Sequence, residues 1–276
     1  MRYGAAMSPM LNIAVRAARA AGRITMRFFE RVDGVKVTAK SHNDFVSDVD
    51  RAAESAIIEH LRGKYPDHAI LAEESGAQAG SRQGDDELEW LIDPLDGTTN
   101  YLHGFPQWSI SIGLRRRGRT ELAVVYDPLH EELFTAERGS GALLNDRKLR
   151  VTQRRGIEGA LIGTGIPFRD HRELKVYLPM LEAILEDTAG VRRAGSAALD
   201  FAYVAAGRLD GFWELGLMPW DFAAGALLVT EAGGMVTDLA GGERYFDTCN
   251  VVAGGAKVQR AMLQRLRPFL GPDLPA

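Results

Sequence analysis

Apolar residues recur every three or four positions along the first sixty residues of the chain. Ser8-Pro9 is typical of a helix start, with serine as the N-cap and proline at the first helical position. The apolar residues that follow fall on one face of a helix, and the same spacing returns after Ser47. We therefore predict amphipathic helices from Ser8 to Phe28 and from Ser47 to Lys64, with a loop or hairpin at Asp33–Asn43 between them.

Beyond residue 68 the spacing changes to short apolar runs bounded by turn residues such as Arg117-Gly118 and Asp127-Pro128. These runs predict strands rather than helices. The strands are expected at Ala69–Ala72, Trp90–Ile92, Trp108–Leu114, Glu121–Tyr126 and Glu132–Ala136. We expect the strand at Trp90–Ile92 to stop at Asp93.

The second half of the chain mixes the two patterns. Strands are predicted at 160–163, 191–194, 211–215 and near residues 235 and 251, and helices at 171–187, 196–206, 221–232 and from 256 onward. The pattern favours an α/β (α+β) protein of two halves, residues 1–150 and 151–276, that share a cleft. No Pro/Gly-rich linker separates the halves, so we expect them to pack closely.

Composition excludes several classes of protein. With 276 residues, 46% of them hydrophobic, the chain is long enough for a large core. A single cysteine, Cys249, rules out an intrachain disulfide and a cysteine-based zinc site, and fits a reducing compartment. Residues 1–10 lack the apolar block of a signal peptide, and no apolar run approaches the roughly 20 residues of a membrane span. We expect a cytoplasmic protein without a membrane partner.

The net charge of −4 gives no global attraction for a nucleic-acid backbone, so direct nucleic-acid binding is not expected. Arg115–Arg119 is locally basic, but a solvated turn between two strands explains it better than an anion site. The six histidines show no ligand spacing typical of zinc hydrolases, and no glycine-rich stretch ends in the Lys-Ser/Thr of a P-loop.

The most informative segment is Asp93-Pro-Leu-Asp-Gly-Thr98, which follows an apolar strand. Magnesium prefers oxygen ligands, usually a few carboxylates together with water and substrate phosphate oxygens. Asp93 and Asp96, on one strand-to-helix turn, fit one or two such ions. The backbone N–H groups of Gly97 and Thr98, at the start of the next helix, would face a phosphate.

Aspartates beside Pro and Gly also cap turns, and taken alone this segment fits that interpretation equally well. Two other acidic positions favour the metal site. Glu73-Glu74 ends a strand, which is where α/β proteins place ligands, and Asp221 opens a helix in the second half. For Asp50, within Ser47-Asp-Val-Asp50, the sequence favours a cap of its own helix over a role in the site. For Glu214, a solvated strand end and a site residue fit the sequence equally well.

These motifs together resemble the inositol monophosphatase family. The resemblance lies in Asp93–Thr98, with Glu73-Glu-Ser75 upstream and Trp220-Asp221 and Glu231-Ala-Gly-Gly234 downstream, and it extends from Met10 to Leu270. Arg193–Asp200, Tyr203–Gly207 and Arg208–Phe212 resemble a bacterial branch of the family in particular.

The resemblance implies a layered α/β/α/β/α sandwich, a homodimer, and lithium-sensitive hydrolysis of inositol 1-phosphate with two or three Mg²⁺ per subunit. It implies direct attack by a metal-activated water, without a phospho-enzyme. The implied metal ligands are Glu73, Asp93, the Leu95 carbonyl, Asp96 and Asp221. The implied catalytic residues are Asp50, Glu73 and Thr98, and the implied substrate contacts are Gly97, Thr98, Ala197, Glu214 and Asp221.

Two alternatives stay open. A sister phosphatase, specific for fructose 1,6-bisphosphate or a 3′-phosphonucleotide, would share the carboxylates and differ in its pocket. Members of the bacterial branch are also associated with transcription-antitermination complexes of ribosomal RNA synthesis. The main role would then be protein binding, with the Arg115–Arg119 and Arg192-Arg193 clusters as candidate contacts.

Overall fold

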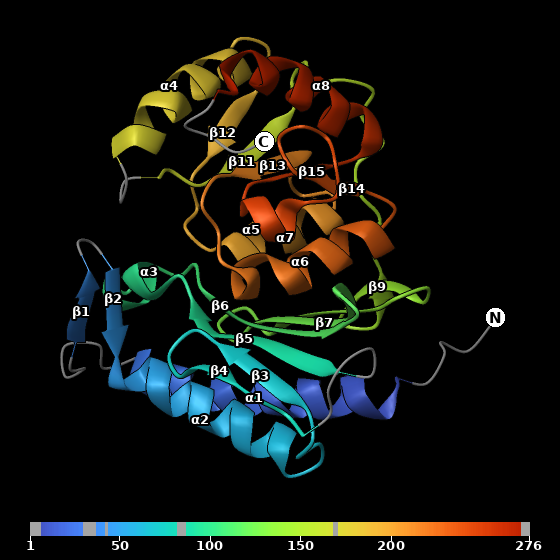
Figure 1. The fold of residues 1–276 in the computed structure, drawn as a ribbon. Coiled ribbons are helices and arrows are strands. Elements are labelled where there is room, and N and C mark those ends of the chain that lie inside the picture. Colours follow the sequence, from blue (N-terminus) through green and yellow to red (C-terminus); the bar gives the residue numbers. More distant parts are fainter. Residues whose placement is uncertain (1–6, 30–36, 42–43, 82–86, 168–170, 272–276) are drawn as a thin grey trace.

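The computed structural model describes residues 7–29, 37–41, 44–81, 87–167 and 171–271. Five layers follow one another through the molecule (Figure 1), which confirms the predicted sandwich. Helices α1 (Pro9–Phe29) and α2 (Asp48–Arg62) form the first layer. Helices α5 (Ala197–Ala205) and α6 (Pro219–Glu231) form the third, and α4 (His171–Leu185) and α8 (Ala256–Leu266) form the fifth.

The second layer is an eight-stranded sheet in the order β10-β9-β8-β7-β6-β5-β3-β4. All its neighbouring strands pair antiparallel except β3 with β5, which are parallel. The strands are β3 (Ala69–Ala72), β4 (Gly76–Gln78), β5 (Leu88–Asp96), β6 (Ser109–Arg116), β7 (Arg119–Asp127), β8 (Glu132–Glu137), β9 (Gly141–Leu144) and β10 (Arg147–Lys148).

The fourth layer is a five-stranded sheet in the order β12-β11-β13-β15-β14. Its strands are β11 (Leu161–Thr164), β12 (Gly190–Arg192), β13 (Gly211–Glu214), β14 (Met235–Thr237) and β15 (Val251–Gly254). Because α6 contacts strands of both sheets, the layer that it forms with α5 joins the two halves of the chain. The division into two domains at residue 150 stays a prediction.

Three hydrophobic clusters hold the layers together. One packs α1 and α2 on the large sheet, around Trp90 and Trp108. The second fills the space around α5 and α6, with Phe201 and Phe222 at its centre, and the third lies between the small sheet and α4 and α8. Burial of a large aromatic or aliphatic side chain contributes about 1.5–3 kcal/mol each, so these clusters fix the layers that carry the site.

The predicted helices and strands are confirmed, with boundaries shifted by a few residues. The predicted loop or hairpin at Asp33–Asn43 overlaps an antiparallel pair, β1 (Val37–Ser41) and β2 (Asp44–Ser47), and its remaining residues lie outside the described part of the chain. Elements that we did not predict are β4, β9, β10 and the short helices α7 (Tyr245–Thr248) and η3 (Arg267–Phe269). Each has four residues or fewer, too short to show a period.

Candidate functional site

A cleft of about 480 Å³ opens where the ends of β3 and β5 face the N-termini of α5 and α6. Segments that are far apart in sequence therefore meet in one place, as the layers of Figure 1 show. Of the sequence-predicted site residues, only Asp50 does not line the cleft. Those that line it are Glu73, Asp93, Leu95, Asp96, Gly97, Thr98, Ala197, Glu214 and Asp221.

Strand β5 ends differently from our prediction. It continues through Pro94 to Asp96, paired with β6 at Asp93↔Ser111 and again at Asp96↔Ser109. The pairing shifts between these two positions, and the Asp93 Oδ1 accepts a hydrogen bond of 2.9 Å from the Leu95 N–H inside the irregularity. A bulge of this kind re-aims side chains. Here it carries both aspartates into the cleft while keeping them on a strand.

Gly97 is required by its surroundings. Its φ of 97° is left-handed, and a Cβ would lie 3.0 Å from the Gln107 carbonyl oxygen and 3.1 Å from that of Gly195. A residue with a side chain would be strained here and would crowd two backbones. Helix α3 (Thr98–Leu102) starts at the next residue, so its first N–H groups have no partner within the helix.

Asp50 lies behind the cleft and reaches it through Thr98. It is fully buried in the first turn of α2, and its Oδ1 lies 3.0 Å from the Thr98 hydroxyl. The Leu95 carbonyl oxygen is also 3.0 Å from that hydroxyl. A hydroxyl carries a single proton, so it donates to one acceptor at a time. The Thr98 oxygen can therefore still accept a hydrogen bond from a donor in the cleft.

Asp96 joins the two halves of the chain. Its carboxylate accepts hydrogen bonds from the Ser196 hydroxyl at 2.5 Å, the Ala198 N–H at 2.8 Å and the Ala197 N–H at 3.3 Å. These donors open α5, where negative charge is favoured by the unpaired N–H groups of the helix. Asn100 adds a second link, donating 2.8 Å to the Ala194 carbonyl oxygen.

The remaining acidic residues approach from three other elements. Glu73 follows β3, and its N–H donates 3.1 Å to the Ile92 carbonyl oxygen. Asp221 lies in the first turn of α6 and accepts 2.8 Å from the Met218 N–H. Glu214 ends β13. A Cβ at Gly165 would overlap the Glu214 carboxylate, so only glycine leaves room for it.

Burial and mutual repulsion dominate the electrostatics of the cleft. Burial raises the pKa of Asp96 to about 6, against the lowering effect of the Ser196 and Ala198 hydrogen bonds. Burial, followed by repulsion from Glu73 and Asp96, raises the pKa of Asp93 well above its usual range. The pKa of Asp221 is raised for the same reasons. The cleft is a concentration of negative charge that a cation would relieve.

The donor set fits a hard cation, although its present spacing is not that of a finished metal site. Among the residues that the structure describes, no three or more His, Cys, Asp or Glu side chains already form a group able to hold an ion. Each of three carboxylates accepts a hydrogen bond from a backbone N–H with at least one of its oxygens: Asp93, Asp96 and Asp221. All the donors are oxygen atoms, which Mg²⁺ prefers, and a bound cation would offset the repulsion among the carboxylates.

Sequence patterns missed three residues that build the site. Glu54 on α2 is buried and accepts hydrogen bonds from the N–H groups of Glu74 at 2.8 Å and Ser75 at 2.9 Å, which fixes the turn that carries Glu73. Ser196 is the N-cap of α5. Asp200 lines the cleft from α5, and burial raises its pKa well above the usual range. A capping pattern could have revealed Ser196. Asp200 ends the Arg193–Asp200 segment that carries the resemblance, but we assigned it no site role, and nothing local distinguishes Glu54.

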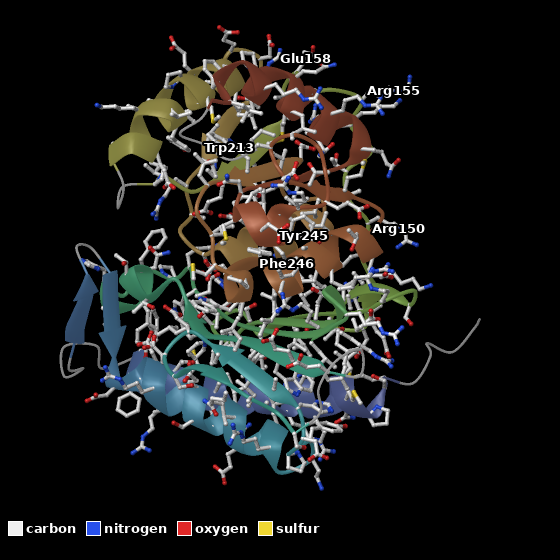
Figure 2. All side chains as sticks on the ribbon, in the orientation of Figure 1. Arg150, Arg155, Glu158, Trp213, Tyr245 and Phe246 are labelled. Carbon is white, nitrogen blue, oxygen red and sulfur yellow. The ribbon has the colours of Figure 1, made fainter. Side chains whose placement is uncertain are left out.

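The arginines of the two basic clusters, Arg115–Arg119 and Arg192-Arg193, differ in the groups that they contact. Arg115 forms an ion pair of 2.5 Å with Glu89, and its guanidinium lies over the ring of Phe246, which is labelled in Figure 2. Arg117 and Gly118 have positive φ angles in the turn between β6 and β7, as the sequence predicted. Arg192 and Arg193 are both exposed, and Arg193 also lines the cleft. Among the described residues no helix is long and apolar enough to span a bilayer.

Comparison with known proteins gives a consistent result. A family model described as the inositol monophosphatase family matches residues 6–270. A relative named Nus factor SuhB, from Pseudomonas aeruginosa, is 54% identical over 270 residues, which are 97% of this chain and 99% of the relative.

Solved structures agree with the sequence comparison. The extragenic suppressor protein SuhB from Bartonella henselae superposes with a TM-score of 0.91 at 44% identity, covering 95% of this chain and all of that one. An inositol monophosphatase from Anabaena superposes with a TM-score of 0.83 at 38% identity, covering 94% of this chain and 95% of the other.

Proposed function

The chain belongs to the inositol monophosphatase family and is accordingly a phosphatase, and on that premise we propose that it hydrolyses inositol 1-phosphate and related polyol phosphates. The observation that carries the proposal is the arrival of Glu73, Asp93, Asp96 and Asp221 at one cleft beside the α3 N-terminus. Such a cleft has separate places for cations and for a phosphate.

The other wall of the cleft supports a polyol as the leaving group. Glu214 and Ala197 line it from the second half of the chain. A carboxylate accepts hydrogen bonds from hydroxyl groups, and a small side chain at residue 197 leaves space for a sugar-sized ring. We assign substrate contacts to Gly97, Thr98, Ala197, Glu214 and Asp221.

We further propose Mg²⁺ as the cofactor, held by Glu73, Asp93, Asp96, Asp221 and the Leu95 carbonyl. When bound, magnesium supplies an activated water and offsets the charge that builds up on the phosphate and the leaving alcohol. Phosphoryl transfer depends mainly on positioning and on neutralising charge. Lithium sensitivity and a homodimer belong to the same proposal.

The chain's own residues contribute the rest of the mechanism. Thr98 and Asp50 form a hydroxyl–carboxylate pair, fixed by the 3.0 Å contact, that orients an attacking water and takes up its proton. Gly97 and the first N–H groups of α3 hold the phosphate. Since this geometry needs no covalent adduct, none of the residues acts as a nucleophile.

A panel of substrates tests the choice of phosphate ester. Phosphate release is measured with magnesium on inositol 1-phosphate, fructose 1,6-bisphosphate, adenosine 3′,5′-bisphosphate and p-nitrophenyl phosphate. We expect the highest kcat/KM on inositol 1-phosphate, and loss of turnover with a chelator or with lithium. A higher kcat/KM on either bisphosphate would assign the chain to the corresponding sister activity instead.

A second candidate function rests on the name of the relatives, Nus factor SuhB. We propose, as this second candidate, that the chain also acts as a protein-binding factor in transcription antitermination of ribosomal RNA. Complementation of a deletion strain separates the two roles. A catalytically inactive Asp93→Asn chain that restores growth would show that protein binding is the essential role, and failure of a folded variant to restore growth would show that catalysis is.

A further inference from the structure

Four arginines form a stripe along the exposed face of α1. Arg16, Arg19, Arg23 and Arg27 follow one another at intervals of three, four and four residues, and all four are exposed. At 3.6 residues per turn they fall within an arc of about 80°, and at 1.5 Å per residue they extend over about 16 Å. We name these four residues the α1 arginine stripe.

Helix α1 has no acidic residue of its own to neutralise the stripe, although Asp127 and Glu131 lie near Tyr126 together with Arg19 and Arg23. Helix α1 contains no Asp or Glu over its 21 residues. Within the described part of the chain no ion pair to any of the four arginines is found. Two of the guanidinium groups lie over aromatic rings instead, Arg19 at 5.7 Å from the centre of Tyr126 and Arg27 at 5.8 Å from the centre of Phe28. Four like charges in one row repel each other, so the stripe favours a polyanionic partner.

An exposed aromatic ring lies beside Arg27 at the C-terminal end of the stripe, about 100° further round the helix. Phe28 keeps 40% of its surface exposed, whereas the next residue, Phe29, packs on Tyr101 and Trp108. An exposed ring beside a cationic groove or row is the feature on which bases of single-stranded nucleic acids stack.

The net charge of −4 gave no expectation of direct nucleic-acid binding, but the local charge of α1 differs from that overall balance. We propose that the α1 arginine stripe and Phe28 bind single-stranded nucleic acid, with the arginines on successive phosphates and one base on Phe28. Arginine presents a planar fork of donors that matches phosphate oxygens, and all four positions are arginine rather than lysine. A membrane surface fits less well, because the apolar face of α1 is already buried against α2 and the large sheet and cannot enter lipid.

This site is separate from the cleft. Helix α1 covers one face of the large sheet, while α5 and α6, which border the cleft, lie on the other face (Figure 1). Substitutions in the stripe are therefore expected to leave phosphate release unchanged. The proposal does not depend on which phosphate ester the cleft accepts.

The test compares two triple variants of the full chain. Arg16→Gln/Arg23→Gln/Arg27→Gln removes three charges of the stripe and keeps Arg19 on Tyr126. Lys175→Gln/Lys257→Gln/Arg260→Gln removes three exposed charges from α4 and α8, at the opposite end of the molecule (Figure 1). Fluorescence anisotropy measures the Kd of a labelled 20-nucleotide RNA of mixed sequence between 50 and 300 mM salt. Circular dichroism and phosphate release confirm that each variant is folded.

We expect the stripe variant to bind RNA at least about tenfold more weakly at 100 mM salt. We expect its slope of log affinity against log salt to shrink by about 2, since each lost phosphate contact accounts for about 0.7. The control variant should stay within about threefold of the unmodified chain. Phe28→Ala should weaken binding about fivefold or more without changing the salt slope, because stacking carries no charge.

Three results would overturn the proposal. One is equal loss of affinity in both triple variants, which would show that only total charge matters. Another is unchanged RNA binding in the stripe variant. The third is binding of a labelled polyglutamate peptide or of anionic phosphatidylserine vesicles more tightly than RNA, which would assign the stripe to an acidic protein or to a lipid surface.

Discussion

Buried carboxylates occur in two settings in this molecule, and the settings differ in what surrounds each charge. Outside the cleft, Glu54, Asp127 and Asp238 are buried one at a time. Each accepts at least two hydrogen bonds from N–H groups of its own or a neighbouring loop: Glu54 from Glu74 and Ser75, Asp127 from Leu129 and His130, Asp238 from Gly242 and Arg244. These carboxylates fix turns, and their contribution is to folding.

In the cleft, Asp93 and Asp96 are buried side by side and Asp221 is half-buried, all within range of each other's charge and that of Glu73. Asp93 and Asp221 each accept a hydrogen bond from one backbone N–H and Asp96 accepts three hydrogen bonds, yet the pKa values of all three rise because of burial and because the charges are crowded. Crowded like charges cost stability unless a cation joins them. The comparison teaches that the same residue type serves folding when isolated and well bonded, and serves binding when crowded.

The largest expected effect is on turnover. Asp93→Asn should lower kcat for phosphate release at least about a thousandfold at saturating magnesium, a loss of roughly 4 kcal/mol of barrier lowering. The matched control is Asp238→Asn, a buried aspartate outside the cleft, which should keep kcat within a few fold. Near-native turnover in a folded Asp93→Asn variant would contradict the claim that the carboxylates of the cleft serve catalysis and those outside it serve folding.

The next effect is a dependence of stability on pH. A carboxyl whose folded pKa is raised binds more protons in the native state than in the unfolded one. Its contribution is fully present below the unfolded pKa and is lost as pH rises through the folded pKa. For Asp96, rising from 3.8 to about 6, this amounts to about 3 kcal/mol.

Metal-free protein should therefore lose stability between about pH 4 and pH 7, and added magnesium should restore more of it at pH 8 than at pH 5. Urea unfolding with chelator or with magnesium at each pH measures both trends. Asp93→Asn should unfold at higher urea than the unmodified chain in chelator at pH 8. A magnesium effect that is the same at both pH values would contradict the account.

A smaller effect is expected at an isolated carboxylate. Glu54→Gln turns one of its two acceptor oxygens into an NH₂ that faces a backbone N–H, so the variant should lose about 1–3 kcal/mol of unfolding free energy. Denaturant titration checks the value. If Glu54→Gln stabilised the metal-free chain as Asp93→Asn does, the two settings would not differ in the way described.

The smallest effect concerns an ion pair between the halves of the chain. Arg208 binds Glu132 through both nitrogens, and the Arg208 side chain is 41% exposed. Its hydrogen bonds lower the pKa of Glu132, so the pair stabilises the fold above the unfolded pKa of about 4.5 and loses that effect as pH falls. Solvent screening limits the contribution to about 0.5 kcal/mol. A double-mutant cycle with Glu132→Gln and Arg208→Gln at pH 7 and pH 3 measures it, and a coupling that grows at pH 3 would contradict it.

Much of the fold was predictable because its signals are local. The apolar period of α1 and the short apolar runs of β6 to β8 depend only on neighbours in sequence. The cleft was predictable in part, since Asp93 and Asp96 come directly after an apolar run in the sequence and Asp221 lies at the start of a helix. The contact of Asp96 with Ser196, a hundred residues away, was not predictable, because it depends on where α5 is placed by the core. The role of Glu54 was not predictable, because its two hydrogen bonds go to the N–H groups of Glu74 and Ser75, twenty residues further along the chain.

The most direct test of the central claim is anomalous diffraction from crystals soaked in Mn²⁺, a heavier substitute for Mg²⁺. The account predicts strong peaks in the cleft, bound to the Asp93 carboxylate and shared with Glu73, Asp96 and Asp221. The same soak of Asp93→Asn should show weaker or missing peaks. No peak in the cleft of the unmodified protein, in crystals that still release phosphate with manganese, would contradict the claim that these crowded carboxylates hold the ions.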